Sequence, residues 1–406
     1  MIYEHSFFPT RKVNGEHDGF ALLEASGFVK MISSGCIALL PFGTALLHKV
    51  SEAIRNIAAD HGFSEVVLPL LQKYDLWEES GRAAKYPGLL CETTIGDKRF
   101  VINPTQEEAV LDLFRQSGFL AKDLPIRVFH LGERVRNEIR PAHGLIRSRS
   151  FTLVDLYALT HSAEDSELAA RDLESVMDGV IKWTGLPARR GMYFPSTMGV
   201  PTYSYWIPSV TKQCIVPVCR NCGASFRVRE ELKTCPLCNH TEFDLVDGAE
   251  IGDVMRSGNN LSSVMQATPV NSDVLVYVAM MGLGVSRLLQ LIAEKHHDDK
   301  GLVFPYHIAP YLVHMIAGEA RANEARQLYH TLNRAGYSVL LDLRKQSLGR
   351  RLVDADLLGA PFRVVLGNKT NAGLYEVRNR LTGESQEATD EYLHTLLMEV
   401  KYEIKE

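Results

Sequence analysis

The sequence predicts an α+β fold with three parts: an antiparallel sheet flanked by helices, a small cysteine-rich insertion and a C-terminal α/β domain. Three observations support this. Two strand-like segments, 126–138 and 150–159, are joined by an arginine-rich loop, which is typical of an antiparallel pair. Four of the seven cysteines form two CxxC pairs within residues 214–245. From about residue 306, strand and helix patterns alternate, which indicates a parallel or mixed sheet.

Hydrophobic periodicity predicts helices near the N-terminus. Helical spacing covers 20–35 and, after a Leu-Pro-Phe-Gly break at 40–43, resumes over 44–62. Gly62 is expected to end the second helix, because glycine adopts the left-handed conformation of a C-terminal cap at little cost. A strand is expected at 63–71, and the proline within it indicates a sheet edge or an interface.

The next segment contains a predicted strand, 99–104, followed directly by a helix. Thr105 and Glu108 have the spacing of a capping box and are expected to begin that helix. A further amphipathic helix is expected at 167–185.

Length and composition indicate an ordinary globular enzyme of two or three domains. The 406 residues are 46% hydrophobic and 23% charged, with a formal net charge of −5. That charge argues against a uniformly basic coat but leaves room for a local basic patch that binds nucleic acid. Neither a membrane-length apolar run nor a secretory signal is recognisable, so a cytoplasmic location is expected.

The cysteine pairs predict a metal site. Cys219 and Cys222 form the first pair, and twelve residues separate it from Cys235 and Cys238. Four thiolates at this spacing suit a tetrahedral Zn²⁺, and a closed set of four protein ligands makes the site structural. An iron–sulfur cluster is the main alternative, and four cysteines that bind no metal are the other.

The arginine-rich loop within 132–151 carries residues suited to an adenine nucleotide. The planar guanidinium of Arg136 can grip phosphate oxygens, Glu138 can accept a hydrogen bond from the adenine amino group, and Phe151 can stack on the base. A surface hairpin with solvated charges is the competing interpretation.

Three segments in order resemble the signature motifs of class II aminoacyl-tRNA synthetases. Residues 39–72 resemble motif 1, residues 132–151 motif 2 and residues 280–305 motif 3. Within that class the prolyl-tRNA synthetases are the most similar, on four internal segments and the last hundred residues, which resemble their anticodon-binding domain. The four segments are 75–82, 103–113, 136–145 and 296–316.

This resemblance implies ATP-dependent activation of an amino acid, expected to be proline, and its transfer to the 3′ end of tRNA, with ATP, Mg²⁺ and structural Zn²⁺ bound. It implies a homodimer built on motif 1, and four regions: 1–190 catalytic core, 191–249 insertion with the zinc ribbon, 250–305 core continued and 306–406 anticodon-binding domain. The implied site residues are Arg136 and Arg287 for catalysis; Arg136, Glu138, Phe151, Arg287 and Gly284 for ATP; Thr105, Glu107, Ser204 and Tyr205 for the amino acid; and Arg344, Lys345, Arg350 and Arg351 for tRNA.

The chain departs from the family pattern around the amino-acid pocket. The interval 158–249 is too short for the large editing insertion of bacterial prolyl enzymes, and Asp253 stands where the family has a histidine. Ser150 and Val154 replace the usual glutamate and lysine, and the segment 203–206 replaces Ser-His-Glu-Phe. Three alternatives therefore stay open: a different amino acid, a carrier-protein acceptor in place of tRNA, and a non-catalytic regulator that senses tRNA.

Overall fold

The computed structural model describes residues 1–3, 10–11, 18–85, 88–194, 202–228, 232–367 and 371–403. The chain divides into two compact units. One unit comprises Met1–Ile32, Ala38–Val50 and Ile292–Glu406, and the other comprises Ser33–Ile37 and Ser51–Leu291. Within the described ranges, no helix combines the length and apolarity needed to cross a membrane.

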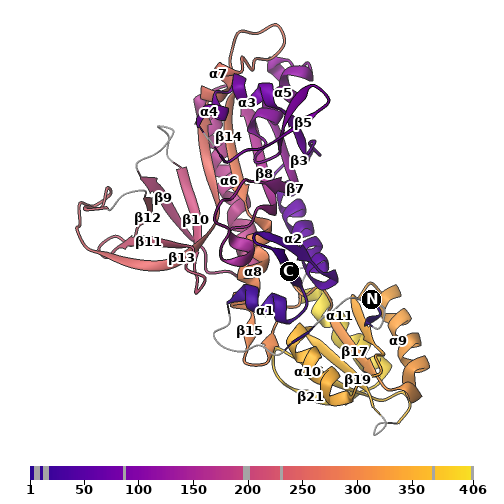
Figure 1. The fold of residues 1–406 in the computed structure, drawn as a ribbon. Coiled ribbons are helices and arrows are strands. Elements are labelled where there is room, and N and C mark those ends of the chain that lie inside the picture. Colours follow the sequence, from indigo (N-terminus) through magenta and orange to yellow (C-terminus); the bar gives the residue numbers. More distant parts are fainter. Residues whose placement is uncertain are drawn as a thin grey trace. The chain divides into compact units, whose positions relative to one another are not determined.

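An antiparallel sheet forms the centre of the unit that contains Ser51–Leu291. Its four long strands are β7 (Ile126–Val135), β8 (Ser150–Thr160), β13 (Phe243–Gly258) and β14 (Tyr277–Leu283), in the order β13-β14-β8-β7. The strands β7 and β8 are antiparallel, as predicted from the sequence. Helix α6 (Ala163–Thr184) packs on β8, β13 and β14 (Figure 1) and buries one apolar face there, which leaves the opposite face of the sheet for other uses.

Shorter elements surround this sheet. The strand β3 extends it beyond β7, and β4, β6 and β5 form a separate three-stranded sheet. The elements are β3 (Ser64–Glu65), β4 (Leu71–Lys73), α3 (Tyr74–Glu79), α4 (Arg82–Lys85), β5 (Cys91–Ile95), β6 (Lys98–Ile102), α5 (Glu107–Gln116) and α7 (Asn260–Val264). The strand predicted at 63–71 is therefore wrong over most of its length. Its middle contains Pro69, which cannot donate a ladder hydrogen bond, and Val67, which is 86% exposed.

The prediction of a helix over 20–35 is also wrong beyond its first turns. Helix α1 (Gly19–Ala25) ends before Gly27, whose φ is +72°, and a hairpin of β1 (Val29–Ser33) and β2 (Cys36–Leu39) follows. Glycine at positive φ terminates the helix, so the apolar spacing beyond it belongs to strands.

The break expected at 40–43 is the start of a helix. Helix α2 (Pro41–Asp60) begins at a proline, whose fixed φ suits the first helical position. Gly43 lies in close contact with the chain at Phe28: an ideal Cβ at this position would lie 2.1 Å from the carbonyl oxygen of Phe28. Gly62 has φ +77° and follows the end of α2, which confirms its predicted role.

The insertion folds as a small closed barrel. Its strands pair in a ring, β10-β9-β12-β11-β13 and back to β10, and Trp206 and Phe226 are buried among them. The strands are β9 (Arg189–Phe194), β10 (Thr202–Pro208), β11 (Cys214–Cys219) and β12 (Ser225–Val228), together with the first part of β13. Because β13 is 16 residues long, it belongs to the barrel at one end and to the central sheet at the other (Figure 1).

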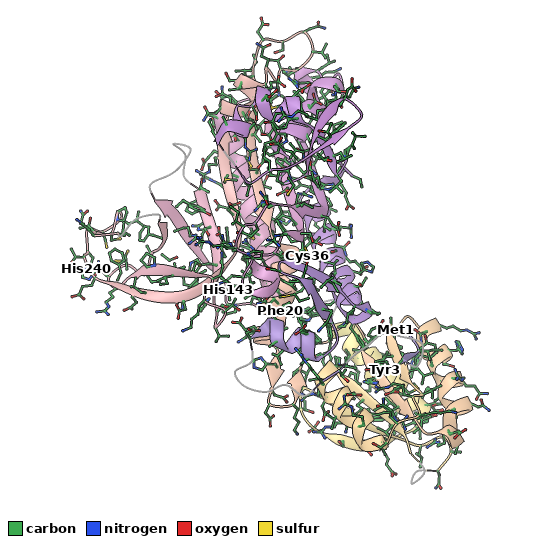
Figure 2. All side chains as sticks on the ribbon, viewed as in Figure 1. Met1, Tyr3, Phe20, Cys36, His143 and His240 are labelled. Carbon is green, nitrogen blue, oxygen red and sulfur yellow. The ribbon has the colours of Figure 1, made fainter. Side chains whose placement is uncertain are left out.

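The other unit contains a five-stranded sheet of order β18-β17-β19-β20-β21, in which β17, β18 and β19 are parallel. The predicted alternation of strands and helices after residue 306 is confirmed. The elements are β15 (His297–Asp298), β16 (Gly301–Leu302), β17 (Val313–Ala317), α9 (Ala322–Arg334), β18 (Val339–Asp342), α10 (Leu348–Leu358), β19 (Phe362–Leu366), β20 (Tyr375–Asn379), β21 (Ser385–Ala388) and α11 (Asp390–Glu403). Met1 and Tyr3, labelled in Figure 2, belong to this unit: the Met1 amine donates to the carbonyl of Val339 (2.8 Å).

Candidate active site

A cavity of about 310 Å³ lies on the face of the central sheet opposite α6. Alternate residues of neighbouring strands form its floor, because side chains two apart on a strand point to the same face. The register places Asp155, Gly282 and Asp253 in one row across β8, β14 and β13. Two residues further along, Tyr157, Met280 and Met255 form a second, mainly apolar row.

Arg136 and Arg287 both line this cavity, although they are far apart in the sequence. Arg136 follows β7 and donates through Nε to the carbonyl of Pro104 (3.2 Å). Arg287 lies in the first turn of α8 (Val285–Lys295) and donates to the carbonyls of Ile146 (3.0 Å) and Glu250 (2.8 Å). Burial, together with the charge of Arg287, lowers the pKa of Arg136, which indicates that the two cations share one site.

Phe151 and Gly284 shape the surroundings of these arginines. The guanidinium carbon of Arg136 lies 5.1 Å from the centroid of the Phe151 ring. An ideal Cβ on Gly284 would lie 2.8 Å from Cδ of Arg287, so glycine leaves the space through which this side chain runs. The arrangement therefore depends on the absence of a side chain at position 284.

Glu138 lines the cavity and also organises the loop between β7 and β8. Its carboxylate accepts from Nη2 of Arg147 (2.9 Å) and from the backbone N–H of Arg140 (3.1 Å). The bond from Arg147 is the main cause that lowers the pKa of Glu138. Arg147, which also lines the cavity, was not singled out from the sequence, because several arginines share this loop and spacing does not rank them.

Thr105 and Glu107 lie at the cavity beside a buried charge cluster. Helix α5 begins at Glu107 with Gln106 as its N-cap, which makes no side-chain capping bond, so the predicted capping box is wrong. The Thr105 hydroxyl instead donates to the Glu107 carboxylate, and Arg82 contacts Glu107 (3.1 Å) and Glu108 (3.0 Å). The buried Glu108 carboxylate accepts from Arg82 and from the Ser80 hydroxyl (2.9 Å), so it closes no capping box.

The two carboxylates of this cluster titrate differently. Burial raises the pKa of Glu107, but the charge of Arg82 and the bond from Thr105 outweigh it and leave that pKa lowered. For Glu108, burial prevails over Arg82 and is joined by repulsion from Glu107, so its pKa rises to about 7. Of the two carboxylates, Glu107 is therefore the one whose surroundings favour the charged form.

Ser204 and Tyr205 lie on β10 and neither lines the cavity. Ser204 donates to Glu250 (3.2 Å), which does line it, while Tyr205 is buried and lies in the field of acidic groups on α6. Tyr193 also donates to Glu250 (2.6 Å). Tyr193 and Glu250 were missed from the sequence because the pairing of the barrel strands brings them to the cavity, and no local motif marks them.

The four cysteines expected to bind metal lie together. Their Sγ atoms are all within 4.8 Å of one another, and Cys219–Cys238 and Cys222–Cys235 are each 3.6 Å apart. Tetrahedral ligands at a Zn–S distance of ~2.3 Å lie about 3.8 Å apart, so the set fits zinc. Among the described residues His240, which Figure 2 labels at the outer end of the insertion, does not belong to this group of ligands.

Backbone geometry explains why the two CxxC pairs match. In each, the residue after the second cysteine has positive φ: Gly223 at +70° and Asn239 at +59°. The N–H of each residue donates to the carbonyl of the first cysteine, at 2.9 Å in both cases. These equivalent turns aim both thiols of each pair at one point.

The basic cluster expected to contact tRNA is only partly exposed. Arg344 pairs with Asp354 (3.0 Å), and its guanidinium carbon lies 3.7 Å from the centroid of the Tyr3 ring. Arg351 is buried and donates to a main-chain carbonyl of β17 (2.7 Å). Lys345 and Arg350 remain at the surface, and Arg350 also contacts Asp354 (3.2 Å).

The nine-stranded, mainly antiparallel sheet, the two arginines in its cavity and the separate mixed α/β unit define the class II aminoacyl-tRNA synthetase architecture. Comparison with known families agrees. Residues 90–296 match the model "tRNA synthetase class II core domain (G, H, P, S and T)", and residues 311–399 match "Anticodon binding domain". The chain therefore belongs to this class, and its 30% identity to a proline–tRNA ligase over nine tenths of both chains places it in the prolyl-tRNA synthetase family.

Individual relatives cover nearly all of the chain. A proline–tRNA ligase of Dinoroseobacter shibae is 30% identical over 91% of this chain and 92% of its own length. One from Parvibaculum lavamentivorans is 29% identical over 96% of this chain and 98% of its own length. The solved structure of Giardia lamblia prolyl-tRNA synthetase in complex with prolyl-adenylate shares the fold, with a TM-score of 0.72 at 19% identity over 91% of this chain and 72% of that one.

Proposed function

We propose that this chain is a proline–tRNA ligase. It activates proline with ATP to form prolyl-adenylate and pyrophosphate, and then transfers the prolyl group to a ribose hydroxyl at the 3′ end of tRNA. Relatives that match over more than nine tenths of their own length carry this activity in their names. The observation that carries the proposal is the convergence of Arg136 and Arg287 on the cavity that Thr105 and Glu107 also line.

In the first step a carboxylate oxygen of proline attacks the α-phosphorus, and the bond to the leaving pyrophosphate breaks. Such a transfer needs positioning and charge stabilisation rather than a protein nucleophile. Arg136 would neutralise charge at the α-phosphate, while Arg287 would hold the phosphate tail and Phe151 would stack on adenine. Mg²⁺ would accompany the nucleotide and neutralise phosphate charge.

The amino-acid end of the cavity is assigned to Thr105 and Glu107. Ionised Glu107 would pair with the proline ammonium, and Thr105 would hold the Glu107 carboxylate in place. Ser204 would act indirectly, because its hydroxyl bonds Glu250 at the cavity wall. Tyr205, a buried residue of β10, would contribute only by packing.

We assign tRNA binding to the unit that matches the anticodon-binding family. Lys345 and Arg350 are its exposed members of the basic cluster and would contact phosphates, whereas Arg344 and Arg351 would hold the surface in shape. A homodimer is expected through motif 1, around the segment of Pro69, as in other enzymes of the class.

Amino-acid-dependent exchange of pyrophosphate into ATP, run with each of the twenty amino acids, tests the activation step. Proline is expected to support exchange, and Arg136→Ala and Arg287→Ala are each expected to lose about 10²-fold or more in kcat. Absence of exchange with every amino acid would refute the assignment. Acylation of tRNA against a phosphopantetheine-bearing carrier protein then identifies the acceptor.

A further inference from the structure

The cavity wall contains five carboxylates, four of which have a cationic partner. Glu107 pairs with Arg82 (3.1 Å), Glu138 with Arg147 (2.9 Å), Asp155 with Arg134 (2.6 Å) and Glu250 with Arg227 (3.5 Å). The fifth is Asp253, which has neither an ion pair nor a side-chain hydrogen bond within the described parts of the chain.

The position of Asp253 makes it available to a ligand. It lies on β13 opposite Gly282, and an ideal Cβ on that glycine would lie 3.4 Å from Oδ1 of both Asp253 and Asp155. Because Gly282 has no side chain, the space above this polar row stays open. The neighbouring row of Tyr157 and Met255 offers apolar surface on the same cavity floor.

A carboxylate at such a place is costly to enclose without a partner. Plain proline has a carboxylate, an ammonium group and an apolar ring. If Glu107 takes the ammonium, the ring brings no donor to Asp253. A pocket that leaves a buried polar group unpaired discriminates against the ligand that lacks the matching group.

From this geometry we infer that Asp253 is a specificity residue that binds a hydrogen-bond donor carried on the ring of the amino acid. The substrate class is thereby extended from proline to prolines that bear a ring hydroxyl or amino group. This inference rests on the proposed function, because it places the amino acid in the same cavity.

The test compares kcat/KM for pyrophosphate exchange with L-proline, both diastereomers of 4-hydroxy-L-proline and both of 4-amino-L-proline. For at least one donor-bearing analogue, the ratio of its kcat/KM to that of proline is expected to exceed one in the unsubstituted enzyme. Asp253→Asn, which keeps the size and removes the charge, is expected to lower that ratio at least tenfold. Asp273→Asn, at an exposed loop position, is the matched control.

The outcomes distinguish failure of the proposed function from failure of the role inferred for Asp253. No exchange with proline or any analogue would refute the proposed function itself. Exchange with proline but a ratio below one for every analogue would overturn the inference and leave the proposed function intact. This comparison uses the unsubstituted enzyme, so it does not depend on a variant that could misfold. An equal loss for proline and analogues in Asp253→Asn would assign Asp253 to the shared ammonium and would also overturn it.

Measuring this substrate preference as a function of pH tests the role of Asp253 further, because a purely structural role would not make the preference depend on pH. Burial, and repulsion from Glu250, Asp155 and Glu107, raise the pKa of Asp253 to about 7 against the attraction of Arg136. Ionisation through this range should strengthen binding of a cationic amino group. The preference for the amino-bearing analogue is expected to rise between pH 6 and 8 in the unsubstituted enzyme and to stay flat in Asp253→Asn.

Discussion

Gly284 and Arg287 show how a single residue can determine the position of another. The Arg287 side chain runs within 2.8 Å of where a Cβ on residue 284 would stand, and its guanidinium is held by two main-chain carbonyls. A Cβ at position 284 would therefore displace the Arg287 side chain near Cδ and break the hydrogen bonds of its guanidinium.

We predict that Gly284→Ala displaces Arg287 and raises the KM for ATP in pyrophosphate exchange by about tenfold, equivalent to ~1.4 kcal/mol. The folded state should persist, because the backbone at position 284 is not in the left-handed region. Gly349→Ala is the control, since nothing lies within 4 Å of its Cβ position. An unchanged KM for ATP in Gly284→Ala would contradict the prediction.

At the scale of elements, Arg82 links α4 to α5 through Glu107 and Glu108. We predict that Arg82→Ala moves the pH dependence of kcat/KM for the amino acid to higher pH. Burial raises the pKa of Glu107, and the charge of Arg82 opposes that effect. Without Arg82 the pKa of Glu107 therefore rises, and Glu107 becomes ionised only at higher pH. The pH profile of exchange is the measurement.

Arg82→Lys serves as the control, because it retains the charge and should keep the profile close to that of the unsubstituted enzyme. A profile in Arg82→Ala that coincides with the original would show that Arg82 does not hold the ionised state of Glu107. Thermal unfolding of both variants separates this effect from loss of structure.

We expect the insertion to depend on a bound metal, because the core around Phe226 is small and includes Cys219 and Cys235 themselves. We predict one zinc per chain by elemental analysis, and loss of that zinc in Cys235→Ser. Removal of the metal by a chelator should unfold the insertion and lower exchange, since its strands carry Tyr193 and Glu250 to the cavity. Cys91→Ser, outside the cluster, should retain the metal; iron in place of zinc would favour the alternative cluster.

At the scale of the whole molecule, ion pairs join segments distant in sequence. Within the unit that contains both, Asp298 at the end of β15 and Arg380 after β20 form two bonds of 2.6 Å. The bond from Arg380 is the main cause that lowers the pKa of Asp298 to about 2, below the ~3.9 of an unfolded chain. Ionised Asp298 therefore stabilises the fold above about pH 4, and that contribution is lost as pH falls towards 2.

We predict that lowering the pH from 5 to 2 reduces the urea midpoint of this unit more in the unsubstituted protein than in Asp298→Asn. The variant should already have a lower midpoint at pH 5. The effect should be modest, because the Asp298 side chain is 37% exposed and solvent screens the pair. Parallel pH dependences would contradict this assignment.

Local patterns in the sequence were sufficient to predict several structural elements of this protein. The strands around the arginine-rich loop, helix α6 and the alternating elements after residue 306 follow from periodicity, and the grouping of four cysteines that could hold a metal follows from their spacing. Patterns failed where a local rule competes with a longer-range contact. The apolar spacing of 20–35 continues through a hairpin, and Thr105 bonds a carboxylate instead of capping a helix.

By itself, the sequence determined the class of enzyme, because the motifs that grip a nucleotide are short and keep their order along the chain. Only the tertiary structure decided which side chains face the cavity together. The pairing of β8, β14 and β13 places Asp155 and Asp253 around Gly282, and closure of the barrel brings in Glu250. Register and closure depend on contacts between residues far apart in sequence, which no local pattern of residue types encodes.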